Sequence, residues 1–274
     1  TRPAPEALKP FVEMFVHRNE TVDGNVVRIL PETRSSVQFR LANPYWVRKR
    51  AAASVWQRVP DISIWAPRHE WGYGFANAQV RVFAFSLTPA GIQALFHQPI
   101  SAYVDTILDA SAFDCFQMLT KTEPVDCFQT WVARMSKALM VFFDNADPTP
   151  PVSNNALSML ATRSSGSVAK AAMMEGLSPR QFRRRFKRAY GLGPKQYQRL
   201  IRVDRQMRQL HPTPWEHDPF DPAPVPFSDQ PHSIREFRDT IGMTPLQYQR
   251  CKQSADQTLR SITEPGVSPP SQAY

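Results

Sequence analysis

The chain has 274 residues, of which 42% are hydrophobic and 21% charged, a composition typical of a globular protein with about two domains. No apolar run approaches the roughly 18 residues that span a bilayer, so the sequence predicts no transmembrane segment. Three cysteines, Cys115, Cys127 and Cys251, lack regular spacing. This disfavours a disulfide framework and a zinc site, and we expect a reducing, cytoplasmic compartment.

The net charge of +9 comes from one short part of the chain. Residues 161–210 contain 13 Lys/Arg and two Asp/Glu, a net charge of +11. Residues 211–260 contain five Lys/Arg and seven Asp/Glu, a net charge of −2. A basic block of this kind indicates a polyanionic partner, most often nucleic acid. A solvated helix surface is the alternative interpretation.

Residues about 22–100 predict a β-rich region. The stretches "NVVRIL", "SVQFRL", "ASVWQRV", "DISIWAP" and "AQVRVFAFSL" are short runs with β-branched and aromatic residues. The turn signals "DG", "NP", "WGYG" and "TPAG" separate them. Several short strands at this spacing favour a sandwich or a barrel.

From Pro89 the pattern becomes helical, because "TPAGIQALF" places a proline at a helix start and apolar residues at helical spacing. We expect helices over residues 101–145, which include the apolar stripe of "VDCFQTWVARMSKALMVFF". The Pro-rich and Asn-rich "DNADPTPPVSNN" is a predicted linker, and "NALSMLATR" a further helix.

The composition suggests four parts. A β-rich effector or dimerisation domain with trailing helices covers 1–145, and a linker covers 146–156. A helical domain covers 157–260, and the end of the chain, 261–274, is a predicted flexible tail.

An internal repeat lies within the helical part. "SPRQFRRRFKRAYGLGPKQY", from Ser178, aligns with "DQPHSIREFRDTIGMTPLQY", from Asp229, when shifted by 51 residues. The coinciding pairs are Arg184 and Arg235, Phe186 and Phe237, Gly191 and Gly242, Pro194 and Pro245, Gln196 and Gln247, and Tyr197 and Tyr248. Agreement at this many positions without a gap indicates two copies of one structural unit.

Each copy predicts a helix, a turn and a second helix. Ser178 is a predicted helix cap followed by Pro179 at the first helical position, and Asp229 is the cap of the second copy. Upstream, "SVAKAAMMEGLS" adds a short helix and a tight turn that contains Gly176. A short helix, a turn with glycine and a second helix are typical of the helix-turn-helix unit.

Residues about 165–252 resemble the tandem helix-turn-helix domain of AraC/XylS-type transcription regulators. The resemblance rests on "GLSPRQFRRRFKRAYGLGPKQY", "RLIRVDRQMRQL" and "FSDQPHSIREFRDTIGMTPLQYQR". Upstream, "RILPE" and "FAFSLTPAGIQALFHQPISAYVD" are similar to the cupin-like sensor domains of one subgroup. The resemblance implies an α+β fold: a β-rich, cupin-like barrel or sandwich, then an all-α tandem helix-turn-helix domain with an irregular, proline-rich second unit.

The resemblance further implies a sequence-specific DNA-binding regulator, with an activator favoured. Double-stranded DNA is then the main partner, and RNA polymerase, a small-molecule effector and a second copy of the chain are further candidates. In this family the second helix of the unit enters the major groove, which here is the basic helix 179–190. The candidate DNA contacts are Arg180, Arg183 and Arg184 to bases, Arg185, Lys187 and Arg188 to phosphates, and Gln230, His232 and Arg235 in the second copy.

The second copy departs from the family pattern. Where the first helix of its unit is expected, residues 212–227 read "PTPWEHDPFDPAPVPF", and proline disrupts a helix interior. We expect an extended segment there. An alternative function follows, that of a protein-interaction regulator which has lost specific DNA binding because its second unit is degenerate.

The sequence predicts no catalytic residues, no cofactor and no metal site. His17, His69, His97 and His211 are scattered, and "GxSxG", "GxxxxGK" and "HExxH" do not occur. A cupin-type metalloenzyme is therefore the least favoured alternative, and we expect a protein that is not an enzyme. The aromatic cluster of the β region is a predicted core, in which Trp71 of "WGYGF" is the candidate ligand-binding or interface residue.

Overall fold

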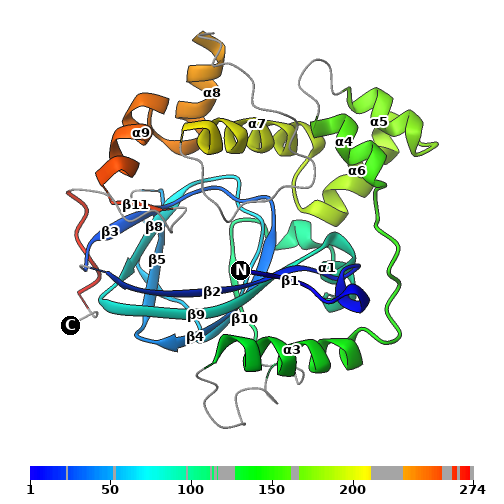
Figure 1. The fold of residues 1–274 in the computed structure, drawn as a ribbon. Coiled ribbons are helices and arrows are strands. Elements are labelled where there is room, and N and C mark those ends of the chain that lie inside the picture. Colours follow the sequence, from blue (N-terminus) through cyan, green and yellow to red (C-terminus); the bar gives the residue numbers. More distant parts are fainter. Residues whose placement is uncertain are drawn as a thin grey trace.

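The computed structural model describes residues 1–22, 24–51, 54–96, 98–111, 113, 116, 127–161, 167–210, 231–254, 261–263 and 266–271. Strands dominate the first part of the chain and helices the second. In Figure 1 the helices after residue 154 lie above and beside the sheets, whereas helix α3 (Phe128–Phe142) lies below them. The predicted α+β fold is confirmed in this respect.

Two antiparallel sheets form the N-terminal part. The six-stranded sheet has the order β1 (Arg2–Pro3), β2 (Val12–Val22), β9 (Ala78–Leu87), β4 (Ser35–Ala42), β7 (Ile62–Trp65) and β10 (Ile107–Asp109). The five-stranded sheet has the order β11 (Ser261–Thr263), β3 (Val26–Ile29), β8 (Gly72–Ala76), β5 (Tyr45–Lys49) and β6 (Gln57–Arg58).

Strand β9 shows how the core is divided, because successive side chains of a strand point to opposite faces. Phe83 and Phe85 belong to the cluster that packs against helix α3 (Phe128–Phe142). Val82 and Ala84, the alternate residues, belong to a second cluster that also contains residues of the five-stranded sheet. The six-stranded sheet is therefore buried on both faces.

The turn predicted at "WGYG" is wrong, because these residues lead into strand β8. Its glycines allow close backbone approach instead of a turn. A Cβ atom on Gly72 would lie 2.9 Å from the Arg48 carbonyl oxygen, and one on Gly74 would overlap the Tyr45 hydroxyl. Both are neighbours in the adjacent strand β5.

The segment predicted to be helical over 101–145 is only partly so. Residues 107–109 form strand β10, and the described helical residues are the end of the 3₁₀ helix η2 (Ile100–Ala102), Phe116 and α3. Helix α1 (Pro89–Leu95) precedes them, with the Thr88 hydroxyl oxygen accepting a hydrogen bond from the Gly91 amide at 3.0 Å.

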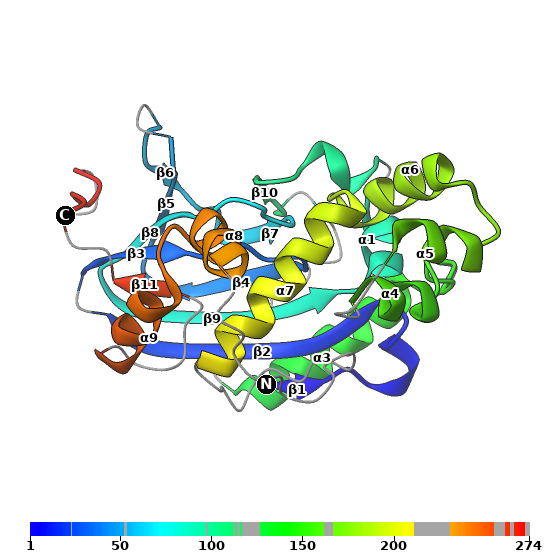
Figure 2. The ribbon, with the colours of Figure 1, turned by 90° about the horizontal axis from the view of Figure 1, so that it is seen from above.

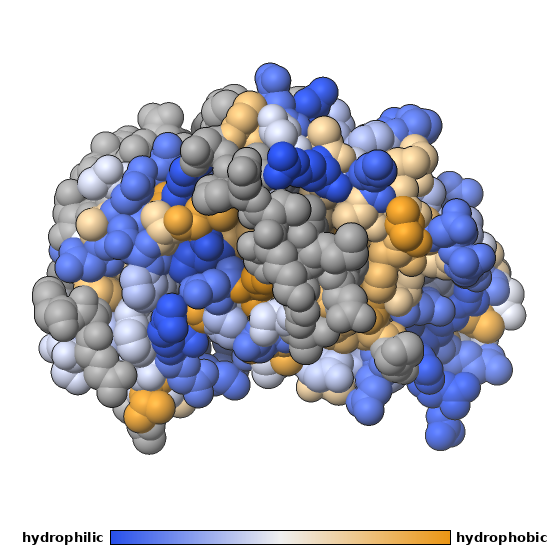
Figure 3. Space-filling view, turned by 90° about the horizontal axis from the view of Figure 1, so that it is seen from below, coloured by the Kyte–Doolittle hydropathy of each residue, from blue (hydrophilic) through white to orange (hydrophobic). Residues whose placement is uncertain are grey.

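Seen from below, the surface is mostly hydrophilic, with separate hydrophobic groups (Figure 3).

The C-terminal part is built around one long helix. Helix α7 crosses above the sheets and joins two groups of helices at its ends (Figure 2). Helix α7 covers Pro194–Leu210. The group before it consists of α4 (Asn154–Ala161), α5 (Val168–Met174) and α6 (Pro179–Tyr190). The group after it consists of α8 (Pro231–Ile241) and α9 (Pro245–Ser254).

Arg28 of strand β3 connects the sheet to helix α8. Its Nη1 donates a hydrogen bond to the Ile241 carbonyl oxygen at 2.9 Å, and its guanidinium lies 4.1 Å from the centre of the Trp71 ring. A cation near the last carbonyls of a helix is stabilising, because it complements the negative end of the helix dipole. Leu30 extends this contact by packing into one cluster with Val203 and Phe237.

The sequence predicts a flexible tail over 261–274, whereas the structure places Ser261–Thr263 in strand β11, antiparallel to β3. Without β11, strand β3 would be the edge of the five-stranded sheet. An edge strand exposes unpaired backbone groups, and the added strand satisfies them.

We expect Gly242→Ala to destabilise the protein more than Gly176→Ala. Both glycines have positive φ, 83° and 65°, so alanine strains either backbone by about 1–2 kcal/mol. At Gly242 the new Cβ would also lie 2.5 Å from Trp71 Nε1 and 2.7 Å from Arg28 Nη1, whereas nothing lies within 4 Å at Gly176. Overpacking adds about 1–3 kcal/mol, which urea unfolding would measure. Equal losses for the two variants would show that this contact contributes nothing.

Candidate nucleic-acid interface

Helix α6, which carries most of the predicted DNA contacts, begins with a capping box. The Ser178 hydroxyl oxygen accepts a hydrogen bond from the Gln181 amide at 3.3 Å, and the Gln181 side-chain oxygen accepts one from the Ser178 amide at 3.0 Å. Pro179 occupies the first turn, where no backbone donor is needed. The predicted start of this helix is confirmed, and its position in the chain is well defined.

Helices α5 and α6 form a tight helix-turn-helix. Ala171 and Ala172 are fully buried, and their small side chains let α5 lie close to α6. Gly176 adopts a φ of 65° in the turn, where residues with a side chain are strained. The Leu177 amide then donates a hydrogen bond to the Ala172 carbonyl oxygen at 2.9 Å. The geometry predicted from "MMEGLS" is present.

Aromatic packing fixes which side of α6 faces outward. Phe182 and Phe186 are fully buried, and the rings of Phe186 and Tyr190 stack with their centres 4.4 Å apart. The exposed Arg183 and Arg184 lie three and four residues after Arg180, and Lys187 lies four and three residues after them. Residues at these spacings are neighbours on a helix surface, so the four cations form one continuous face.

This four-cation face, Arg180, Arg183, Arg184 and Lys187, carries uncompensated charge. Among the residues that the structure describes, no salt bridge joins any of the four to a carboxylate. The face also begins in the first turn of α6, where the helix dipole adds positive potential. It therefore presents an anion-binding surface that contains three arginines.

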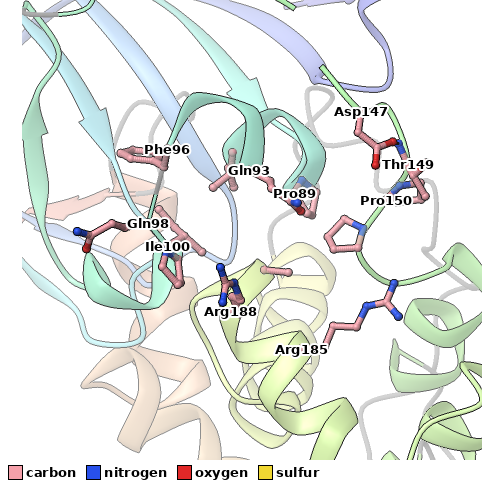
Figure 4. A pocket seen from close by; sticks show the side chains of 14 residues that line it. Pro89, Gln93, Phe96, Gln98, Ile100, Asp147, Thr149, Pro150, Arg185 and Arg188 are labelled. Carbon is pink, nitrogen blue, oxygen red and sulfur yellow. The ribbon is translucent and has the colours of Figure 1, made fainter. Parts of the chain in front are cut away.

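Arg185 and Arg188 lie on a different edge of the same helix. Both line a cleft whose other walls are α1, the segment that follows it, and Pro150 and Pro151 (Figure 4). Nη1 of Arg185 lies 3.9 Å from the Glu175 carboxylate, a long ion pair. The structure thus separates these two predicted phosphate contacts from the four-cation face.

The end of α6 packs on the N-terminal part of the chain. Gly191 has a φ of 76°, and a Cβ atom there would lie 2.8 Å from a methyl group of Val104. Tyr190 is buried beside it, and this burial raises the pKa of its hydroxyl well above the ordinary value. The same helix that presents cations outward therefore contacts the β-rich part through its last turn.

Four further arginines of helix α7, none of them predicted as a contact from the sequence, make contacts within the protein. They are spaced three residues apart and contact α4, α8 or α7 itself. Arg199 Nε donates to Thr240 Oγ1 at 2.9 Å, Arg202 Nε to Glu236 Oε2 at 3.0 Å, Arg205 Nη1 to the Ala161 carbonyl oxygen at 2.5 Å and Arg208 Nη2 to Asp204 Oδ2 at 2.7 Å. Part of the basic block is therefore structural.

In the second helix-turn-helix copy, the structure describes the side chain of one of the three predicted DNA contacts, Arg235. Arg235 is exposed on α8, but Glu236 and Asp239 lie on the same helix. His232 is in α8, but its side chain is not among those described, and Gln230 lies outside the described residues. The proline-rich stretch 212–227 also lies outside them, so its predicted extended structure stays a prediction.

Trp71, the candidate ligand-binding residue, packs between the sheet and the second copy. It is buried, its ring lies edge-on to Tyr73 at 5.4 Å, and Gly242 approaches its indole. It does not line the cleft beside α6. Its predicted ligand-binding or interface role stays a prediction.

Metal clusters and membrane-spanning helices are both absent from the described part of the chain. No group of three or more His, Cys, Asp or Glu side chains there lies close enough to hold a metal ion. No helix there has both the length and the apolar character that crossing a membrane requires.

We expect Arg184→Ala to leave the free energy of unfolding within about 0.5 kcal/mol of the parent, because an exposed side chain is removed. Phe186→Ala should lower it by about 3–5 kcal/mol, because a fully buried ring leaves a cavity. Chemical denaturation would measure both. Similar losses would mean that the inward and outward sides of α6 are misassigned.

Comparison with known proteins locates the family resemblance. A family model described as a helix-turn-helix domain matches residues 168–250, which include α5 to α8 and most of α9. No curated protein matches the chain. One similar solved structure is ToxT from Vibrio cholerae, with 9% sequence identity and a TM-score of 0.46; the match covers 86% of this chain and 98% of that chain. Another is unsaturated fatty acid-bound wild-type ToxT from Vibrio cholerae, with 10% identity and a TM-score of 0.46; the match covers 86% of this chain and 94% of that chain.

The matched region coincides with the residues that predicted the tandem unit. It contains the capping box of α6, the glycine turn between α5 and α6, and both copies of the repeated glycine, Gly191 and Gly242. Residues 168–250 thus match a family of helix-turn-helix domains, and the helix-turn-helix domain predicted from the sequence is confirmed for this part of the chain.

Proposed function

We propose that the protein is a sequence-specific DNA-binding transcription regulator that reads the major groove mainly through α6. The observation that carries the proposal is the four-cation face on a helix held by a capping box, a glycine turn and an aromatic core. A helix in this position of a helix-turn-helix is the one that enters the groove. The family match of residues 168–250 supports the same conclusion.

The side chains of the four-cation face divide by their chemistry and position. Arg180, Arg183 and Arg184 lie in the first half of α6, nearest the end that enters the groove. An arginine can donate two hydrogen bonds to O6 and N7 of a guanine, which discriminates by about 1–3 kcal/mol. Lys187, one turn further along, is assigned to a phosphate, which positions the helix without specifying sequence.

The second copy is assigned a smaller role in DNA binding. Of its three predicted DNA contacts, Arg235 is the one whose side chain the structure describes. Acidic residues lie near it on α8. Arg202 and Arg199 contact α8 from the side of α7 and hold it in place. We infer that α8 adds a limited contact to a site read mainly by α6.

The N-terminal part, residues 1–145, is proposed as the effector or dimerisation domain, joined to the helical domain 157–260 by the linker 146–156. Its contacts with both helix-turn-helix copies, through Gly191 and Arg28, support a regulatory role. An effector or partner that favours one arrangement of these contacts would shift the population of DNA-competent molecules. The exposed Met140 and Val141 at the end of α3 favour this helix as a dimer surface.

A second candidate function is a protein-interaction regulator without specific DNA binding. Its support comes from Ile234 and Leu246, which are 36% and 56% exposed in the second copy. Exposed apolar groups beside acidic residues suit a protein surface better than a DNA backbone. RNA polymerase is a candidate partner for either function. In both cases the protein is proposed not to be an enzyme and to act in the cytoplasm.

We expect Arg184→Ala to weaken binding to a specific DNA site roughly 10- to 100-fold, because it removes one base-reading side chain. Arg235→Ala should weaken binding by less than about fivefold, because its helix is net acidic around it. Arg2→Ala removes an exposed cation from strand β1, outside α3, α6 and α8, so it is the matched control and should bind as the parent does. Electrophoretic mobility shifts with excess competitor DNA would measure all three, and the opposite order of the two effects would assign the reading helix to α8.

Lys187→Ala tests the division between positioning and reading. Losing one phosphate contact should weaken binding to specific and random DNA by similar factors and reduce the slope of log K against log salt by about 1. Fluorescence anisotropy over a salt series would measure both slopes. A loss of binding confined to the specific DNA sequence would reassign Lys187 to a base contact. If the parent protein binds all DNA sequences equally, the second candidate function is favoured.

A further inference from the structure

The outer face of the five-stranded sheet carries a row of stacked cations and aromatic rings. Tyr73 of β8 lies directly opposite Arg28 of β3 and Arg48 of β5, so the three side chains share one face. The Arg48 guanidinium lies 4.7 Å from the centre of the Tyr73 ring and 5.1 Å from that of the Trp56 ring. At the other end, Arg28 lies over Trp71, whose ring is edge-on to Tyr73. The aromatic–arginine row thus consists of Trp56, Arg48, Tyr73, Trp71 and Arg28.

The C-terminal segment, here residues 261–263 and 266–271, contacts both ends of this row. In β11, Ile262 pairs with Arg28 at one end. At the other end, Trp56 Nε1 donates a hydrogen bond to the Ser268 carbonyl oxygen at 3.3 Å. Pro270, two residues further along, is buried. The C-terminal segment therefore lies on the sheet as well as at its edge.

These contacts are of the kinds by which proteins bind extended peptides. An added strand satisfies the backbone groups of a sheet edge, as β11 does for β3. A proline-containing segment docks on aromatic side chains because its restricted backbone loses little entropy, and its carbonyl groups stay free to accept hydrogen bonds. Ser268 precedes two prolines in the sequence, and its carbonyl accepts from an indole. The C-terminal segment is therefore held as a bound peptide would be.

We propose that the outer face of the five-stranded sheet is a binding site for an extended, proline-containing segment, and that the C-terminal segment of the same chain is its occupant. Three contacts hold the occupant: the strand pairing of β11, the Trp56 hydrogen bond and the burial of Pro270. Covalent attachment raises the effective concentration of such an occupant to roughly the millimolar range, so a segment of modest affinity fills the site.

The same segment restrains the second helix-turn-helix copy. Strand β11 contacts α9, the last helix of that copy, while it pairs with β3 (Figure 1). The residue of β3 opposite Ile262 is Arg28, whose side chain donates a hydrogen bond to the last carbonyl group of α8. Displacement of the C-terminal segment therefore removes the neighbour of the strand that holds α8. Local opening of α8 becomes more frequent when the site is emptied.

A fluorescein-labelled peptide with the sequence of residues 261–271, SITEPGVSPPS, tests the site by fluorescence anisotropy with full-length variants. In Pro270→Asp a carboxylate replaces a buried ring, so the C-terminal segment leaves the site and the free peptide can enter. Ser271→Asp adds the same charge at the exposed neighbouring residue and is the matched control. The peptide should bind Pro270→Asp at least about tenfold more tightly than it binds the parent or Ser271→Asp.

Two further changes test how the peptide is recognised. Trp56→Phe keeps an aromatic ring and removes the indole donor, so in the Pro270→Asp chain it should weaken peptide binding about two- to tenfold. A peptide that itself carries Pro270→Asp should bind at least about tenfold more weakly than the unchanged peptide. Equal peptide affinities of the parent and Pro270→Asp would overturn the proposal, and so would an affinity that Trp56→Phe leaves unchanged.

Hydrogen–deuterium exchange in the full chain measures the restraint on the second copy. Trp56→Phe and Pro270→Asp should each speed exchange in β11 and α8 about threefold or more, and leave exchange in α5 of the first copy unchanged. Circular dichroism checks that each variant is folded, and Trp56→Phe alone carries this test if Pro270→Asp is not. Unprotected β11 amides in the parent would overturn the occupation of the site, and unchanged exchange in α8 would overturn the restraint. Neither measurement depends on DNA binding.

Discussion

Burial of Phe182 and Phe186 against the small side chains of α5 is the contact on which the rest of the functional surface depends. Ala171 and Ala172 let the two helices approach, and the phenyl rings then leave only one orientation for α6. In that orientation the cations at the neighbouring positions must point away from the core. The aromatic core thus converts a basic stretch of sequence into a directed cationic face.

The excess positive charge of residues 161–210 serves three structural roles. The four-cation face of α6 points to solvent, and Arg185 and Arg188 line the cleft toward the N-terminal part. The arginines of α7 pair with α4, α8 and Asp204, and so hold α4 and α8 against one helix. Net charge alone indicates a polyanionic partner, but only the packing shows which cations are available to it.

Local signals were sufficient for the caps and turns of the helix-turn-helix, whereas long-range contacts, and the strands β8, β10 and β11, were not predictable from them. Ser178, Gly176 and the repeated Gly191 and Gly242 act within a few residues of their own position, so the caps and turns could be predicted. The hydrogen bond from Arg28 to the Ile241 carbonyl oxygen joins residues 213 positions apart, and no local sequence pattern indicates it. Gly72 and Gly74 misled for the same reason, since the strand that excludes their side chains lies elsewhere in the sequence. The cleft beside α6 needs three distant segments and had no signal at all.

Selection of bound sequences from a randomised DNA pool tests most directly whether α6 reads bases. We expect the parent protein to enrich one motif, and Arg184→Ala to enrich the same motif with the preference lost at one or two adjacent base pairs. That result would show a side chain of the four-cation face in contact with particular bases. Enrichment of no motif by the parent, or an identical motif and affinity for Arg184→Ala, would contradict the assignment of α6 as the reading helix.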